Sequence, residues 1–466
     1  MPNNYDSYVN MLNAIRNSAS ERFSNAVPSA DGTVDNLKTI GALLTSNQAF
    51  ANEWLDALYN RIAFTRLITM DGWKNPLREF KRKLEFGESY LEVAQRLIKP
   101  HVRDYEYAKS HFMDINTPAV SSSIYHINSE RFYPVSVLPL ELRKAFLSYE
   151  ALSEFVDGIV NNLYRSMEYD EFLAMKYVIC RAISTGKMTA CEIPTVSSAN
   201  AREIVTRIKG VSNKMEFLNN SYSAEDMETY CEKRDQFLLM NADFNAVIDV
   251  SVLAVSFNMS LAEFMGQQRL VDSFGDLDTD RLDELFKYDP LYTTPTDAEL
   301  AEFASIPCVL ISRDWFVCFD QATEMYSNEN GMGPYRNYNL HCNRIYSFSN
   351  FMKACYFVEG TQSITSVSVA PATKVMAKGD IATFKATVVN VNLADPSVVW
   401  SLAFTASEQG TPAEEVSDYY VLDYIDYQTC AVRQIKALDG NLTGVTLTAT
   451  SVFDNSKKGT ARISES

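Results

Sequence analysis

The sequence predicts an α+β fold followed by a separate all-β domain at the C-terminus. Apolar residues recur every three or four positions from about 140 to 183, the pattern of one long helix or two collinear helices. Between 187 and 330, helical patterns alternate with apolar runs that are typical of strands. At about residue 361 the composition changes to alternating Thr, Val, Ser and Ala, which predicts a β-sandwich over residues 363–466.

Composition places the chain among ordinary folded proteins. It has 466 residues, of which 46% are hydrophobic and 22% charged, so two or three domains with substantial cores are expected. The formal net charge of -17 makes most of the surface repel phosphate, and groove-reading DNA binding is therefore not expected. The sequence shows no signal-peptide pattern and no run of about 18 apolar residues, so we expect a cytoplasmic product without a membrane partner.

Motifs for chemistry are missing or incomplete, so we expect no enzyme activity, no cofactor and no metal. The eight cysteines include no CxxC pair, which argues against a disulfide framework and a zinc site. Asp276, Asp278 and Asp280 have the spacing of a calcium loop, but Arg281 and Lys287 stand where that loop needs Gly and Glu. We interpret this stretch as a solvated acidic loop or the start of a helix.

The N-terminal part of the chain is predicted in three pieces. Residues 1–71 indicate an arm with one helix, because helical spacing is clear only around 46–65. Residues 72–137 contain short apolar runs broken by charges and prolines, which predicts an extended, hairpin-like excursion with little core of its own. The long helix follows in residues 138–199.

The remainder of the body is predicted to combine helices with strands. A helix over about 201–217 precedes the apolar runs 237–240 and 308–312. The turn residues 331–334, Gly-Met-Gly-Pro, separate two stretches of alternating character, which predicts a pair of strands.

A basic strip stands out in this acidic chain. From residue 74 to residue 83 the only acidic side chain is Glu79, and the local charge is +4. The five cations are Lys74, Arg78, Lys81, Arg82 and Lys83. In one interpretation the strip is a solvated face of a strand or helix. In the other it belongs to an excursion that docks on another copy of the chain.

Seven segments, in this order and spacing, resemble one protein family. They are NAIRNS at 13–18, NPLREFKR at 75–82, KAFLSYEALSEFVDGIVNNLY at 144–164, EYDEFLAMKYV at 168–178, NADFNAVIDVSVLAVSFNMSLAEFMG at 241–266, SRDWFVCFD at 312–320 and VVWS at 398–401. Together they are similar to the major capsid (head) proteins of small short-tailed phages of the phi-twenty-nine type. The resemblance covers nearly the whole chain.

The resemblance implies the tailed-phage major capsid fold of the Hong-Kong-ninety-seven type, with a C-terminal bacterial immunoglobulin-like (Ig-like) group 2 domain. The implied parts are an N-terminal arm and helix (1–71), an extended loop (72–137), a peripheral domain with a long spine helix (138–199), an axial domain (200–305), return strands of the peripheral domain (306–362) and the Ig-like domain (363–466). In this fold the extended loop lies across a neighbouring subunit. The basic strip would therefore form a subunit interface with acidic side chains of an adjacent copy.

The implied function is structural. The resemblance implies a major capsid protein that self-assembles as pentamers and hexamers into the icosahedral or prolate head of a tailed double-stranded DNA bacteriophage. Its implied partners are further copies of itself, a scaffolding protein, a portal or connector protein, and packaged double-stranded DNA bound without sequence specificity. It would be a virion protein assembled in the host bacterial cytoplasm, and its acidic charge suits a wall that does not grip the packed genome.

Two other functions stay open at this point. A bacterial surface adhesin would use the Ig-like domain to bind a glycan or a receptor. An encapsulin-like protein compartment would share the shell fold but enclose an enzyme. In a phage head the Ig-like domain would project outward and either tie capsomers together or contact the host.

Overall fold

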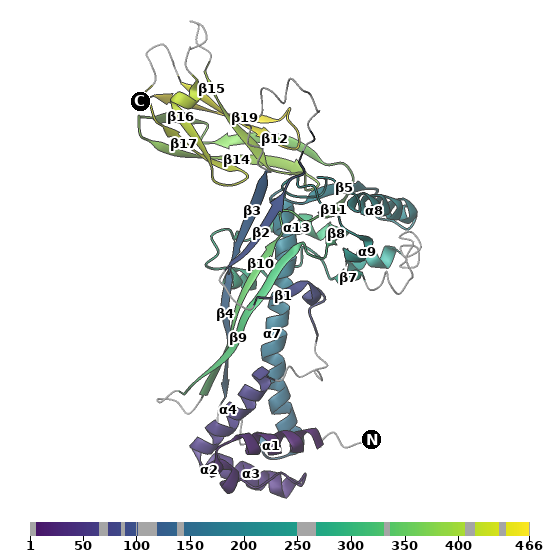
Figure 1. The fold of residues 1–466 in the computed structure, drawn as a ribbon, viewed down its shortest axis with the longest axis vertical. Helices are drawn as coiled ribbons and strands as arrows, with labels where there is room; N and C mark the ends of the chain where they lie inside the picture. The colour runs from purple at the N-terminus through teal and green to yellow at the C-terminus, as the bar shows by residue number, and fades with distance from the viewer. Residues whose placement is uncertain are drawn as a thin grey trace.

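The computed structural model describes residues 6–64, 73–84, 89–98, 100, 119–137, 144–248, 267–329, 336–405, 415–437 and 444–465. These residues form an elongated molecule with one long helix through its body (Figure 1). Helices from the N-terminus gather at one end, and a β-sandwich from the C-terminus stands at the other (Figure 1). The architecture is α+β, which confirms the fold class predicted from the sequence.

The long helix, α7 (Tyr149–Ser184), is a single helix of 36 residues. At 1.5 Å per residue it is about 54 Å long. It begins later than the predicted position near residue 140, because the side chain of Ser148 caps it by accepting a hydrogen bond from the backbone N–H of Ala151. Its C-terminal half is buried on all sides and runs through the largest hydrophobic core.

The N-terminal segment is more ordered than the predicted arm with one helix. Its helices are α1 (Asp6–Ser18), α2 (Glu21–Ala26), α3 (Val34–Ser46) and α4 (Gln48–Phe64). The predicted helix is α4, whereas α1, α2 and α3 occupy the stretch expected to be an arm. Ser20 and Thr33 cap α2 and α3 through their side chains, and Ile15, Phe23 and Leu37 are buried against the first half of α7. Helix α2 has only six residues, too few to show a helical period, whereas α1 and α3 have 13 residues each and their helical spacing is present in the sequence but was not recognised.

The NAIRNS segment holds the connection that follows α2. The side chain of Asn13 donates to the carbonyl of Ala30 at 2.9 Å and accepts from its N–H at 2.7 Å. Arg16 donates to the carbonyl of Val27 at 2.7 Å. Through these hydrogen bonds, Asn13 and Arg16 hold the connection after α2 against α1, next to the buried apolar side chains of the helical cluster.

A four-stranded sheet runs along α7 in the order β1-β9-β10-β4. Its strands are β1 (Lys81–Lys83), β9 (Phe316–Glu329), β10 (Arg336–Phe348) and β4 (Ser129–Val137). Strands β9 and β10 pair antiparallel, as predicted, and the turn between them lies outside the described residues. Because β1 and β4 join this sheet, residues 81–83 and 129–137 belong to the body and not to the predicted excursion.

One part of the predicted excursion forms a hairpin-like structure of its own. This part is a two-stranded ribbon. It consists of β2 (Ser89–Gln95) and β3 (Val120–His126), which pair antiparallel. The two strands run along the upper half of the molecule in Figure 1 and point toward the sandwich. Residues 85–88 and 101–118, which also belong to the predicted excursion, lie outside the described residues.

A second sheet has the order β5-β11-β8-β6-β7. Its strands are β5 (Thr189–Ile193), β11 (Ala354–Glu359), β8 (Cys308–Ser312), β6 (Gln236–Asn241) and β7 (Gln268–Val271). Helices α8 (Ala201–Met215) and α9 (Ala242–Val247) cover one face, while α7, α12 (Thr279–Leu285) and α13 (Asp297–Ala304) contribute to the core on the other. Because β5, β8 and β11 come from outside 200–305, this sheet crosses both predicted boundaries of the axial domain.

The C-terminal residues form two packed sheets, which confirms the predicted all-β sandwich. The first sheet contains β12 (Ser363–Ala370), β14 (Ile381–Val391), β17 (Thr429–Gln434) and β16 (Tyr420–Tyr424). The second contains β13 (Thr373–Met376), β19 (Lys458–Glu465), β18 (Val445–Ser451) and β15 (Val398–Phe404). Trp400 and Phe384 lie in a core that draws its residues from the sandwich alone.

The sandwich is fastened to the C-terminal end of α7. The hydroxyl of Tyr356 on β11 donates to the carbonyl of Leu393 at 2.6 Å, and the Ser397 hydroxyl donates to the carbonyl of Thr185 at 3.3 Å. Gly186 has a φ of 69°, and a Cβ at this position would overlap the carboxylate of Asp395. Glycine is therefore required where the helix ends against the sandwich.

We expect the sandwich to fold when it is expressed alone as residues 361–465, because its core contains no side chain from the rest of the chain. Trp400 is the one tryptophan in this range, so its fluorescence reports on the core directly. Thermal denaturation followed by that fluorescence should show a cooperative transition. A fragment without such a transition would show that the sandwich depends on the spine for its stability.

Candidate subunit-assembly site

The first residues of the basic strip are hydrogen-bonded to the spine helix. The side chain of Asn75 donates to Oε1 of Glu171 at 3.1 Å, and its backbone N–H donates to Glu168. Leu77 and Phe80 are buried in the main core, and β1 then pairs in parallel with β9. The strip is therefore an integral edge of the body, and apolar burial fixes its backbone.

Lys81, the first residue of β1, belongs to a mostly buried group of four charges. Lys81 Nζ lies 2.7 Å from Glu171 Oε2 and 3.6 Å from Asp320 Oδ2. Arg344 on β10 reaches the same two carboxylates, at 3.1 and 3.4 Å. Glu171 is 1% exposed and Arg344 3% exposed. The two cations and two carboxylates join β1, β9 and β10 to α7.

The surroundings of Arg344 keep it charged. Burial by itself would lower the pKa of this guanidinium, but the oxygen of Tyr346 and the two nearby carboxylates raise that pKa well above its ordinary value. A buried cation of this kind is stable only while its negative partners are present. The position of β1 is therefore coupled to the charge on Glu171.

Arg82 also has partners within its own chain. Its guanidinium lies 3.6 Å from Asp314, donates to the carbonyl of Phe316 at 3.2 Å and stacks over the Phe319 ring at 5.5 Å. The expectation that the strip finds its acidic partners on another copy is therefore revised for Lys81 and Arg82. The reason is that β1 lies between β9 and the spine helix. Asp320 lies on β9 and Asp314 just before it, while Glu171 comes from α7.

The remaining cations of the strip point outward. Lys74, Arg78 and Lys83 are exposed, and none of them forms an ion pair with any residue that the structure describes. Beside them, the Trp73 ring is 48% exposed, although it packs edge-on against Phe172 at 5.5 Å. For these three cations, a contact with another copy stays a prediction.

The ribbon carries a second surface that was not predicted from the sequence. Leu91 on β2 is paired with Ile124 on β3, and these side chains are 56% and 60% exposed. Val93 and Val120 lie on the same face and are equally open to solvent. We call these four residues the apolar face of the ribbon. Its signal in the sequence was hidden, because apolar residues occur at both odd and even positions of β2.

The opposite face of the ribbon rests on the body. Tyr90 packs on Phe319 with ring centroids 4.6 Å apart. Glu92 accepts hydrogen bonds from the hydroxyls of Tyr125, at 3.0 Å, and Ser349, at 2.8 Å. The ribbon is therefore supported from behind while its apolar face is directed to solvent.

The acidic stretch that resembles a calcium loop begins a helix, as predicted. Asp278 is the N-cap of α12, and its side chain accepts from the backbone N–H of Arg281 at 3.2 Å. Within the described ranges there is no group of three or more His, Cys, Asp or Glu side chains that could hold a metal ion. Likewise, no helix in the described part of the chain is long and apolar enough to span a membrane.

One known protein family matches most of the chain. Residues 12–358, roughly three quarters of the chain, match the family model described as "Phi29-like phage major capsid protein". The chain belongs to this family. The capsid protein is therefore a structural component of a tailed-phage head and of the virion, and not an enzyme. The adhesin and enzyme-compartment alternatives are set aside.

Individual relatives agree with the family match. The capsid protein is 29% identical to the major capsid protein of Bacillus phage B103, over 84% of this chain and 82% of that one. It is 26% identical to the major capsid protein of Bacillus phage GA-1, over 87% of this chain and 85% of that one. A solved capsid structure of Staphylococcus phage Andhra is similar with a TM-score of 0.48 and 12% identity, over 64% of this chain and 87% of that one.

The buried charges predict a strong effect of one nearly isosteric change. Glu171→Gln removes the more deeply buried of the two carboxylates that Lys81 and Arg344 share and leaves them with Asp320 alone, so we expect the free energy of unfolding to fall by about 3–5 kcal/mol in urea denaturation. Glu284→Gln is the matched control, because Glu284 pairs with Lys287 on the surface and its loss should cost about 0–1 kcal/mol. Similar small losses for both variants would contradict the structural importance of Glu171.

Proposed function

We propose that copies of this capsid protein close into an icosahedral or prolate shell of pentamers and hexamers by burying the apolar face of the ribbon on a neighbouring copy. The observation that supports this proposal most strongly is the exposure of Leu91, Val93, Val120 and Ile124 on one face of a supported ribbon. An isolated two-stranded ribbon with an open apolar face gains stability when that face is covered.

The free energy that burial of the apolar face would contribute suits reversible assembly. Full burial of an aliphatic side chain contributes about 1.5–3 kcal/mol, and each side chain of the apolar face is already partly buried, so each adds roughly 1 kcal/mol. One such contact is weak in isolation. A subunit in a closed shell meets several neighbours, and the combined contacts become strong through their number. Weak single contacts also allow a misplaced subunit to leave.

We further infer that the body has the Hong-Kong-ninety-seven-type fold. In this assignment α7 is the spine helix, the ribbon is the core of the extended loop, and the five-stranded sheet with α8 and α9 forms the axial domain. The long strands β9 and β10 return along the spine. The sandwich is assigned as the Ig-like group 2 domain, on the basis of its two four-stranded sheets and its buried Trp400.

The same proposal gives the capsid protein its further partners. A head of this kind requires a scaffolding protein during assembly, a portal protein at one vertex and double-stranded DNA inside. We propose that the DNA is enclosed without sequence specificity, which the net charge of -17 supports because an acidic wall does not bind phosphate. A strongly basic inner surface in an assembled head would contradict this part of the proposal.

The sandwich is proposed to project outward from the shell. It has a core of its own and stands at the end of the molecule, beyond the C-terminus of α7 (Figure 1). In this position it could tie neighbouring capsomers together or contact the host surface. Deleting residues 363–466 separates the two roles. Shells that assemble normally but adsorb less well identify host contact, whereas fragile shells identify the tying role.

The ribbon's part in assembly is tested by the double variant Leu91→Asp/Ile124→Asp. Both side chains face solvent in the single chain, so we expect a folded protein that no longer forms closed shells, because two charges would be buried at the contact. Circular dichroism checks folding, and sedimentation with negative-stain microscopy checks assembly. Ile381→Asp/Val399→Asp makes the same change at exposed apolar positions of the sandwich and serves as control. Closed shells from the ribbon variant at the wild-type yield would refute the proposal.

A further inference from the structure

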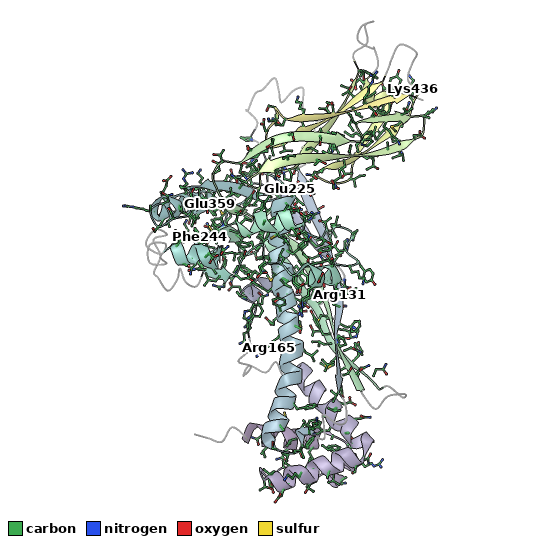
Figure 2. The ribbon with its side chains drawn as sticks, turned by 180° about the vertical axis from the view of Figure 1, so that it is seen from behind. Arg131, Arg165, Glu225, Phe244, Glu359 and Lys436 are labelled. Atoms are coloured by element: carbon green, nitrogen blue, oxygen red, sulfur yellow. The ribbon has the colours of Figure 1, made fainter. Side chains whose placement is uncertain are left out.

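A groove lies between the root of the ribbon and the loop that follows α12. It encloses about 410 Å³ and is lined by Ile124, Asn128, Arg131, Tyr288, Asp289 and Leu291, among others. Tyr288 is 82% exposed and Leu291 75% exposed, so two large apolar side chains stand open at its wall. Figure 2 labels Arg131 and shows its position beside the sheet, away from the sandwich and the N-terminal helices.

The walls of the groove are fixed. Arg131 donates to the carbonyl of Glu284, and its guanidinium lies 5.5 Å from the centre of the Tyr288 ring. Asn128 donates to the Asp289 carboxylate at 3.1 Å. The groove is therefore present before a partner binds, and it offers the partner an apolar surface of fixed shape.

Acidic side chains line the groove at Glu130 and Asp289, and more of them lie beside it on α12, where the carbonyl of Glu284 accepts the hydrogen bond from Arg131. We call residues 274–307 the acidic segment, since it contains nine acidic and two basic side chains. Asp280 is exposed and forms no ion pair with any described residue, and Glu284 pairs only with its helix neighbour Lys287 among them. Glu130, on β4 at the edge of the groove, is also exposed. A partner for this surface should therefore combine cations with a large apolar side chain.

The chain itself carries such a surface at the other edge of the same sheet. The sheet order β1-β9-β10-β4 places the basic strip at one edge and Glu130 and Arg131 at the other. Lys74, Arg78 and Lys83 are exposed there together with Trp73, which we call the strip face. Tryptophan and arginine are the residues found most often at the energetic centre of protein interfaces.

We propose that the strip face of one copy docks in the groove and on the acidic segment of the next copy. This inference rests on the proposed function, because it requires that copies assemble. The two surfaces differ and lie at opposite edges, so the contact is head-to-tail, the type of contact that generates a ring of subunits when the rotation between copies closes. Ile124 lines the groove and also belongs to the apolar face of the ribbon, so the groove continues the proposed ribbon contact.

Charge reversal on either side tests the contact. Lys74→Glu/Arg78→Glu/Lys83→Glu reverses the strip face, and Glu130→Lys/Asp280→Lys/Glu284→Lys reverses one carboxylate of the groove and two on the neighbouring helix α12. Each full-length variant is expressed with the other head genes of its phage, and closed shells are counted by sedimentation and negative-stain microscopy. We expect each triple variant to lower the yield of shells at least tenfold, because like charges then face each other across every contact.

Restoring complementarity should restore assembly. The chain with both sets of substitutions should return to within about threefold of the wild-type yield, because cations and carboxylates have exchanged sides. Mixing the two triple variants should also recover rings with an even number of subunits, since every strip face then meets a groove of opposite charge. Lys374→Glu/Lys378→Glu/Lys385→Glu, which reverses three exposed lysines of the sandwich, should leave the yield unchanged.

The possible outcomes separate this inference from the proposed function. If the wild-type chain forms no shells, the proposed function fails. If the wild type assembles and both triple variants assemble equally well, or if neither the combined chain nor the mixture recovers, the docking inference is wrong and the proposed function stands. If only the groove variant fails and it has lost co-sedimentation with the scaffolding protein, the groove binds that protein and the inference is again overturned.

Discussion

The shared carboxylate of Glu171 is the interaction on which the arrangement of the body depends. It lies on the spine helix and pairs with Lys81 from β1 and Arg344 from β10, and the side chains of Glu171 and Arg344 are buried. Moving the spine helix away from these strands would leave Lys81 and Arg344 with Asp320 alone, which is more costly than losing a surface ion pair. The edge of the sheet and the root of the ribbon are therefore held at one orientation relative to the spine.

The neighbouring residue on the helix holds the opposite edge. Asp170 receives a hydrogen bond from Tyr133 on β4 at 2.9 Å and pairs with Arg281 of α12 at 2.5 Å. Burial raises the pKa of the Asp170 carboxyl, and the bonds from Arg281 and Tyr133 partly offset this rise. Nearly two turns later, Lys176 donates hydrogen bonds to the Asp272 carboxylate at 2.9 Å and to two backbone carbonyls of the same connection. A single helix thus fixes both the basic strip and the acidic segment, and so sets the spacing of the two surfaces that we propose to meet between copies.

The sequence could predict elements that depend on residues close together in the chain, but not contacts between residues that are far apart in it. The spine helix, α4, the β9–β10 pair and the start of the sandwich all produce a local pattern, either a helical period or alternation between turns. Lys81 and Glu171 are far apart in the chain, so nothing local to the basic strip showed that two of its cations are paired internally. The strands β8 and β11 are apolar on both faces, and their sequence could not show that they join a sheet with β6. The ribbon's apolar face escaped notice because Tyr90 and Leu91 are both large, yet only the pairing with β3 decides which side faces the body.

In the proposed shell, another copy of the chain covers the apolar face of the ribbon. Hydrogen–deuterium exchange of the free protein and of closed shells measures this contact, because β2 and β3 pair only with each other among the described strands and keep unpaired backbone N–H groups on their outer edges. We predict that amides of residues 89–98 and 120–126 exchange at least tenfold more slowly in shells, while the exchange of the buried strands of the sandwich core is unchanged. Equal exchange rates of the ribbon in the two states would show that no other copy covers it.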